Sequence, residues 1–179
     1  MKKALIGTAL VIGMIGSAAA ATNCSSFPDN VVTGNVNDDV FASGYTCTIA
    51  ASAFVNGNVL QVGDGDLVIR GIVNGAAEET GIGSIIVAKG EVGGNLTEAD
   101  AGNITIRGGS TIKGSVEEYD AGSVLATLNG FFEGNIAELD LGNLETRGAG
   151  TFKGNSEHAL PGTCVNSIAD FQGAVCNLL

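Results

Sequence analysis

A glycine-centred tag recurs along most of the chain at an interval of about 20 residues. It has the form apolar-x-Gly-(Asn/Ser)-apolar, as in VTGNV at 32–36 and FEGNI at 132–136. The spacings between its central glycines are 23, 18, 19, 20, 20 and 20 residues, and these glycines are Gly34, Gly57, Gly75, Gly94, Gly114, Gly134 and Gly154. Such a period, with apolar and polar residues alternating inside it, is typical of a parallel β-helix with one coil per repeat.

The tag predicts an all-β, single-domain parallel β-helix (β-solenoid). We expect about 6–7 rungs of 18–20 residues with right-handed coils, because one coil cannot bury its own inner face and coils must stack. Three apolar columns should form the core. They are Val32, Val55, Val73, Val92, Ile112, Phe132 and Phe152; Val36, Val59, Ala77, Leu96, Val116 and Ile136; and Leu67, Ile85, Ile104, Val124 and Leu144. Columns of Asn and Ser after the glycines should form the corners, where Gly and Asn tolerate positive φ.

The first residues have the pattern of a bacterial secretory signal. Lys2 and Lys3 precede an apolar stretch at 4–16, and small residues follow at 17–21. This stretch is too short for a transmembrane helix. We predict a signal peptide at 1–21, an N-terminal cap and first coil at 22–48, β-helix repeats at 49–156 and a C-terminal cap at 157–179, the last as a short helix or a closing hairpin. The mature chain has no predicted transmembrane segment.

Four cysteines lie as one pair near each end, and an even count in an exported chain indicates disulfides. Three pairings are open. We favour Cys24–Cys47 and Cys164–Cys176, because the repeats between would hold the two pairs far apart. Neither pair has the CxxC spacing of redox or zinc sites. These disulfides should staple the two ends.

The mature chain is strongly acidic. Removing Lys2 and Lys3 leaves 8 − 2 = 6 basic residues against 19 acidic ones, a net charge of 6 − 19 = −13. Phosphate binding needs the opposite sign, so nucleic acid is excluded as a partner. Cations, basic surfaces and neutral polysaccharide remain as candidate partners, together with end-to-end self-association through exposed strand edges.

The segment AGNITIRGGSTIKG at 101–114 resembles the repeats of filamentous-haemagglutinin-type exoproteins. The Gly-x-apolar-x-Gly rhythm of residues 31–156 is also similar to that of bactofilins, which polymerise end to end. The resemblance implies the β-solenoid architecture and carries over no functional residue. The predicted signal peptide and cysteines depart from the bactofilin pattern, and the chain is much shorter than haemagglutinin-type exoproteins.

A Glu-x-Asp motif stands at one place in three successive repeats. It supplies Glu98 and Asp100, Glu118 and Asp120, and Glu138 and Asp140, and the Glu column extends back to Glu79. Residues i and i+2 of a strand share a face. We expect both carboxylates to face solvent, with Ala99, Tyr119 and Leu139 pointing inward. Two interpretations stay open: a face that binds Ca²⁺ or a basic partner, or a solvated acidic face.

Two further patterns bear on function. Arg70, Lys89, Arg107 and Arg147 recur at one place of the repeat and should form a basic stripe. The single histidine, His158, follows the Glu column with no nucleophile pattern nearby, so no catalytic residue is predicted and the chain is not expected to be an enzyme.

The sequence therefore predicts an exported, non-enzymatic structural protein, secreted or on the cell surface, with the periplasm as a further location. We expect a subunit of an extracellular filament, matrix or adhesive layer. The alternative is a module that binds calcium or a cationic ligand through its acidic ladder. A polysaccharide-active enzyme is a remote third interpretation, because repeats without long loops build no cleft.

Overall fold

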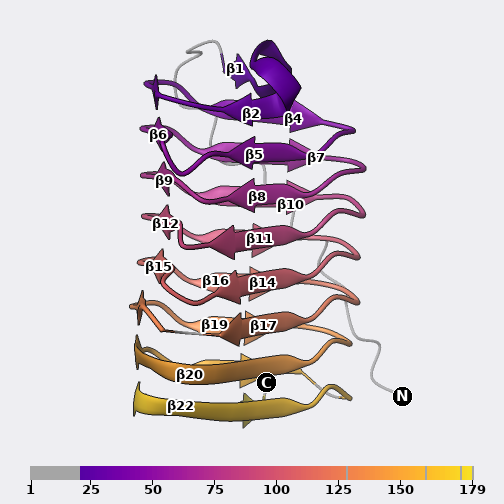
Figure 1. The fold of residues 1–179 in the computed structure, drawn as a ribbon. Helices are drawn as coiled ribbons and strands as arrows, with labels where there is room; N and C mark the ends of the chain where they lie inside the picture. The colour runs from indigo at the N-terminus through magenta and orange to yellow at the C-terminus, as the bar shows by residue number, and fades with distance from the viewer. Residues whose placement is uncertain (1–20, 128, 160, 174, 179) are drawn as a thin grey trace, which may run out of the picture.

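The structure, a computed structural model, describes residues 21–179 except 128, 160, 174 and 179. It is a parallel β-solenoid of about eight turns. The coils stack along one axis into a rod, with the N-terminal coils at the top of Figure 1 and β22 at the bottom. The all-β solenoid prediction is confirmed. The predicted signal peptide lies outside the described residues, apart from Ala21.

Each typical coil contributes three short strands, and every strand pairs in parallel with its equivalent in the next coil. One sheet has nine strands. In spatial order they are β1 (Thr22–Asn23), β4 (Val40–Ser43), β7 (Val59–Val62), β10 (Ala77–Thr80), β13 (Leu96–Glu98), β16 (Val116–Glu118), β19 (Ile136–Glu138), β21 (Ser156–His158) and β23 (Asn177–Leu178).

The other sheet has fourteen strands, and its path crosses two faces of the rod because the long strand β20 turns a corner and belongs to both. Its first face contains β2 (Val31–Val32), β5 (Cys47–Ile49), β8 (Leu67–Ile69), β11 (Ile85–Ala88), β14 (Ile104–Arg107), β17 (Val124–Thr127) and β20 (Leu144–Lys153). Its second face contains β3 (Asn35–Val36), β6 (Phe54–Val55), β9 (Ile72–Val73), β12 (Glu91–Val92), β15 (Thr111–Ile112) and β18 (Phe131–Phe132). Strand β22 (Cys164–Gln172) pairs with β20.

The three predicted apolar columns form the core. Each of their members is buried, and none exceeds 7% exposure. They meet their equivalents in register, as Leu96 does with Val116 and Val116 with Ile136. Near the C-terminal end the core is aromatic: the rings of Phe132 and Phe152 stack at 4.8 Å between centroids, and Phe171 continues the stack at 4.5 Å.

Most tag glycines are needed because adjacent coils pack closely against them, and not because the corner requires positive φ as the sequence suggested. Only Gly34 and Gly154 among them have positive φ. A Cβ atom on Gly114 would lie 2.3 Å from the carbonyl oxygen of Gly94, and one on Gly134 would lie 2.1 Å from that of Gly114. Most tag glycines therefore allow adjacent coils to approach closely at the corner, and backbone conformation alone decides only at Gly34, where a Cβ would meet no atom within 4 Å.

The polar corner columns connect successive coils along the axis. The Asn95 side-chain oxygen accepts from the Ser115 backbone N–H at 3.1 Å, and that of Asn103 accepts from the Ser123 N–H at 3.0 Å. The Ser123 hydroxyl in turn accepts from the Asn143 N–H. These side chains satisfy backbone donors at bends, where the ladder of strand hydrogen bonds is interrupted.

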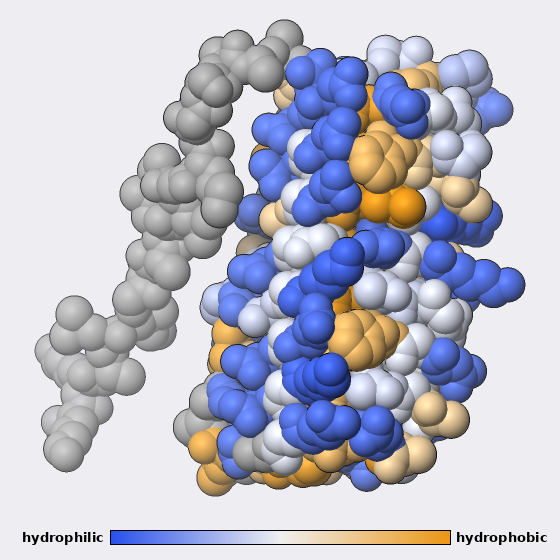
Figure 2. Space-filling view, turned by 90° about the vertical axis from the view of Figure 1, so that its left-hand side faces the viewer, coloured by the Kyte–Doolittle hydropathy of each residue, from blue (hydrophilic) through white to orange (hydrophobic). Residues whose placement is uncertain are grey.

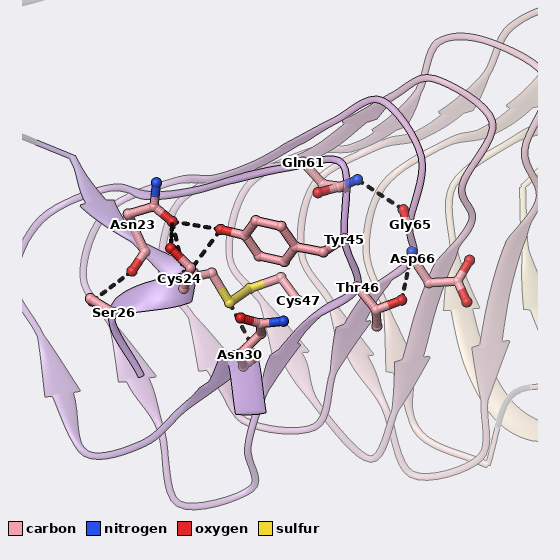
Figure 3. Close-up of a disulfide and its surroundings, with 11 residues drawn as sticks. Asn23, Cys24, Ser26, Asn30, Tyr45, Thr46, Cys47, Gln61, Gly65 and Asp66 are labelled. Carbon is pink, nitrogen blue, oxygen red and sulfur yellow. Dashed lines mark hydrogen bonds between the residues drawn. A yellow bond between two sulfur atoms is a disulfide. The ribbon is translucent and has the colours of Figure 1, made fainter. Parts of the chain in front are cut away.

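The N-terminal end is closed. Two short 3₁₀ helices, η1 (Cys24–Ser26) and η2 (Pro28–Asn30), cover the first coil, and the Cys24–Cys47 disulfide fixes them to β5. The Asn23 side-chain oxygen caps η1 by accepting from the Ser25 N–H and from the Tyr45 hydroxyl (Figure 3). Cys24 and Cys47 are fully buried, so this end has a covalently fixed cap.

The C-terminal segment differs from the helix or hairpin that we expected. Strand β22 continues the parallel stack on β20, and β23 pairs in parallel with β21. The predicted disulfide Cys164–Cys176 is present and joins the two parts of this coil. Segment 157–179 thus adds a further turn of solenoid. No helix among the described residues is long and apolar enough to cross a membrane.

Candidate functional site

The two carboxylates of the Glu-x-Asp motif lie on opposite sides of the coil wall. Glu98, Glu118 and Glu138 have no exposed surface, whereas Asp100, Asp120 and Asp140 are exposed. The expectation that both face solvent is therefore wrong for the glutamates. Each glutamate is the last residue of its strand, two positions after a core residue, and strand alternation turns it inward.

The buried glutamates form one column through four successive coils. Strand pairing places Glu79 opposite Glu98, Glu98 opposite Glu118, and Glu118 opposite Glu138. Neighbouring strands in a sheet are about 4.8 Å apart. We refer to Glu79, Glu98, Glu118 and Glu138 as the carboxyl ladder.

One oxygen of each carboxyl from Glu98 onward holds the turn that follows its strand. Glu98 Oε1 accepts from the N–H groups of Asp100 at 3.2 Å and Gly102 at 3.1 Å. Glu138 repeats this pattern with Asp140 at 3.0 Å and Gly142 at 2.9 Å. A carboxylate that accepts such bonds from the inside acts as the cap of a tight turn.

Glu118 makes the equivalent bond to Gly122 N–H at 2.9 Å. The glycine is required there, because a Cβ on Gly122 would lie 1.6 Å from the carbonyl oxygen of Gly102 and 2.3 Å from Glu118 Oε1. The repeated unit is thus Glu-x-Asp-x-Gly, in which glutamate and glycine together build the turn.

Different side chains occupy the two ends of the column. Gln61 aligns with Glu79, and its Nε2 donates to the carbonyl oxygens of Gly63 at 3.3 Å and Gly65 at 2.9 Å (Figure 3). His158 aligns with Glu138 and is 9% exposed. This interior position can therefore hold either of two side chains. An amide there donates hydrogen bonds to the carbonyl groups of its turn, and a carboxyl there accepts hydrogen bonds from the N–H groups of its turn.

The second oxygen of every ladder carboxyl lacks a hydrogen-bond partner. These atoms are Oε2 of Glu79, Glu98, Glu118 and Glu138, and Oε1 of Glu79 is unpartnered as well. Two ionised carboxylates 4.8 Å apart would repel by about 3.5 kcal/mol at an effective dielectric constant of about 20. A fully ionised ladder would therefore oppose folding.

The pKa values of the ladder follow from this environment. Burial raises the pKa of Glu98 to about 9, and the neighbouring carboxyls of Glu79 and Glu118 act in the same direction, against the lowering effect of the Asp100 and Gly102 N–H groups. Burial also raises the pKa of Glu118 to about 7. The pKa of Glu79 is raised by burial too.

The residues predicted to point inward between the acids lie outside. Tyr119 is 38% exposed, and its hydroxyl donates to Glu117 at 2.9 Å. Ala99 and Leu139 are half-buried, outside the core. The strands end at the glutamates, so the aspartates lie in the following turn and do not continue the alternation; Asp120 also has a φ of +83°.

A cation site made from the six motif carboxylates would have to span the coil wall. Within 21–179, leaving aside the four undescribed positions, no three His, Cys, Asp or Glu side chains gather in an arrangement that could hold a metal ion. The outward half of the motif, Asp100, Asp120 and Asp140, remains available to solvent and to basic partners.

The predicted basic stripe is exposed but imperfectly aligned. Arg107 pairs in register with Ala88, and Arg147 with Thr127, so Lys89 lies one residue outside the column. Arg147 forms an ion pair with Glu145 on the same strand. On another side of the rod, where β6, β9, β12 and β15 lie, hydrophilic residues form a column along the axis beside apolar ones (Figure 2).

A shallow hollow of about 480 Å³ lies on the outer side of β11, β14, β17 and β20. Its lining combines a polar corner column with an outward-facing column and the edge of buried Val124: Asp66, Ser84, Asn103, Ser123 and Asn143 beside Ile86, Thr105, Leu125 and Glu145. The corner residues were expected to have a structural role only. Their alignment beside outward-facing Ile86 and Leu125 was the available signal for a surface hollow.

Comparison with protein-family models, with curated proteins and with solved structures found no match for this chain. The structure has the β-solenoid architecture that the resemblance to haemagglutinin-type exoproteins and bactofilins implied. This shared feature is the architecture alone.

Proposed function

We propose that the protein is an exported, non-enzymatic structural rod that acts as a subunit of an extracellular matrix, filament or adhesive surface layer. Two disulfides at opposite ends indicate an oxidising, extracytoplasmic environment. Between residues 31 and 158 no connection between successive strands exceeds five residues. Connections of this length build no loop-walled cleft, which favours a scaffold over a catalyst.

The observation that carries the proposal is the contrast between the two ends of the rod. The 3₁₀ helices and a buried disulfide close the N-terminal coil. In the last coil, by contrast, the inward-facing Ile168 and Phe171 are only half-buried. Within the described residues β22 pairs on one side only, with β20; the first strands β1, β2 and β3 do so as well, but η1 packs against β2 at that end. An unpaired strand edge is a ready template for another strand.

The last coil also lacks the charge that would keep two copies apart. Segment 159–179 contains one acidic residue, Asp170, and no basic residue, although the chain as a whole is strongly acidic. Three exposed apolar side chains lie here, Val165 at 49%, Val175 at 46% and Leu178 at 60% exposure. A second copy of the same coil matches this cross-section in shape and in its apolar interior.

Because the N-terminal end is closed, two copies would meet through the same coil. This contact is two-fold symmetric and pairs β22 with its equivalent in antiparallel fashion. The pair would be a rod of about twice the length, and it favours a matrix or surface layer of paired rods over a head-to-tail filament.

Light scattering after size-exclusion chromatography tests this assembly. We expect a concentration-dependent dimer of the disulfide-bonded protein. Ile168→Lys, which places a charge inside the open coil, should abolish it, whereas Ser167→Lys on the outer side of the same strand should not. A monomer at all concentrations, or a dimer that survives Ile168→Lys, would refute the contact. Immunoelectron microscopy of the native cell surface then tests the location.

The outer hollow favours polysaccharide as a second ligand class. Hydroxyl and amide groups aligned beside Ile86 and Leu125 offer hydrogen bonds and an apolar surface, which are the two contacts that sugars use. NMR titration with neutral glycans should shift the amide signals of Asn103 and Ser123 and leave those of Thr111 on another face unchanged. Equal shifts, or none, would exclude the hollow as a glycan site.

A further inference from the structure

The carboxyl ladder is enclosed without a buried lysine or arginine among the described residues. The buried polar side chains of the described residues are the ladder itself, Gln61, His158, and three hydroxyl residues, Ser110, Thr146 and Ser156. No lysine or arginine is among them. An ionised carboxylate in such surroundings needs a partner, and buried acids without one become protonated.

We propose that the ladder holds protons between successive carboxyl groups, so that the solenoid is stabilised by acid and loosened by base. This property is separate from the proposed structural role, because it concerns the conditions under which the rod stays folded. It rests on the burial, register and unpartnered oxygens of the ladder.

The geometry gives each proton two carboxyl groups to bind. Glu98 stands between Glu79 and Glu118 in register, and its carboxyl contacts both of theirs. Its Oε1 is occupied by the turn amides, and its Oε2 is buried without a hydrogen-bond partner. A hydroxyl on Glu98 donates to a neighbouring carboxyl oxygen and gives two otherwise unpartnered oxygens a bond. Because the glutamate recurs in successive coils, a shared proton can recur between successive carboxyl groups.

The groups around the ladder oppose its ionisation. Asp66 and Asp100 act on Glu79 through their charges, and Asp120 acts on Glu118 together with the ladder neighbour Glu138. The other sheet contributes apolar side chains and the hydroxyl of Thr146, and Ser156 lies on β21 of the ladder's own sheet. His158, aligned with Glu138, is the one basic side chain on the column.

The direction of the pH effect follows from proton binding. The pKa values of about 9 for Glu98 and about 7 for Glu118 lie above the ordinary value of 4.5. The folded protein therefore binds more protons than the unfolded chain above pH 4.5. The ladder's stabilisation is complete below that pH and is lost as pH rises through about 7 and then about 9.

Chemical denaturation of the disulfide-bonded protein at pH 5 and pH 9 tests the proposal. The unfolding equilibrium constant should rise at least about tenfold from pH 5 to pH 9. The Glu98→Gln, Glu118→Gln double variant should lose most of this rise, because an amide donates as the protonated acid does. Glu117→Gln, on the outer face beside Glu118, removes one carboxyl outside the ladder and should keep the rise.

Carbon-13 NMR of the wild-type carboxyl groups keeps the test decisive even if the double variant does not fold. We expect the side-chain carboxyl signals of Glu98 and Glu118 to show the protonated form at pH 6, with the outward-facing Glu117 as the reference signal. Ionised signals from the whole ladder at pH 6 would overturn the proposal, as would a double variant that keeps the wild-type pH dependence.

Discussion

The two acids of each Glu-x-Asp motif are separated by one residue but occupy opposite environments. Glu98 is fully buried and holds a turn through two backbone N–H groups, whereas Asp100 is exposed. The same contrast recurs one and two coils further on. Two carboxylates copied together by repetition therefore carry different physical roles, and a repeated acidic pair does not by itself define a binding face.

The largest difference should appear at the glycine that completes the inner turn. Gly122→Ala places a methyl group 1.6 Å from a carbonyl oxygen of the adjacent coil, so a coil must shift. We expect a loss of at least about 3 kcal/mol in the free energy of unfolding, measured by urea denaturation. Gly109→Ala is the control, since Gly109 has positive φ but its nearest atom is 3.6 Å away. Equal losses would show that backbone conformation, not coil contact, sets the effect.

The inner and outer acids should respond differently to removal. Glu98→Ala leaves two turn N–H groups unpartnered and opens a cavity, so we expect a loss of about 2–4 kcal/mol at pH 5. Asp100→Ala removes a solvated side chain and should change stability by less than about 0.5 kcal/mol. Urea denaturation of both variants gives the comparison, and a larger effect at Asp100 would reverse it.

At the outer position the backbone should matter more than the carboxylate. Asp120 has a φ of +83°, which glycine adopts without strain. Asp120→Gly should therefore raise the free energy of unfolding by up to about 1 kcal/mol. Asp100, which lacks positive φ, should lose about 0.5–1 kcal/mol on the same replacement. Thermal unfolding of both variants measures the contrast, and a loss at both sites would contradict it.

The smallest expected effect concerns calcium. With the glutamates inside, only the aspartates of the motif face solvent, so we expect the melting temperature to stay unchanged in millimolar Ca²⁺. Differential scanning calorimetry with Mg²⁺ as the control measures this. A rise specific to Ca²⁺ that disappears in Asp120→Asn would restore the cation-binding alternative.

Much of the fold could be predicted from the sequence because the repeat and its apolar columns encode it directly. Val116, Phe132 and their equivalents were placed in the core by spacing alone, and the disulfide pairing followed from the distance between the ends. The form of the last coil could not be predicted, because segment 157–179 lacks the tag although its backbone continues the stack.

The alternation of residues in the sequence indicates that the glutamates face inward, but acidic side chains usually face solvent. Alternation from Val116 places Glu117 outside and Glu118 inside, and the structure follows it. Glutamate is almost never fully buried without a partner, which favoured the opposite assignment. The missing clue was Gly122, four residues on, whose N–H reaches the inward carboxyl. Such a bond depends on the turn, which spacing alone does not specify.

Carbodiimide labelling of the folded protein, mapped by mass spectrometry, tests the division of the motif most directly. We predict that Asp100, Asp120 and Asp140 are modified rapidly, whereas Glu98, Glu118 and Glu138 react only after unfolding. The reagent prefers protonated carboxyls, so protonation of the ladder would work against the predicted protection. Glutamates that react in the folded protein as fast as the aspartates would contradict the buried ladder.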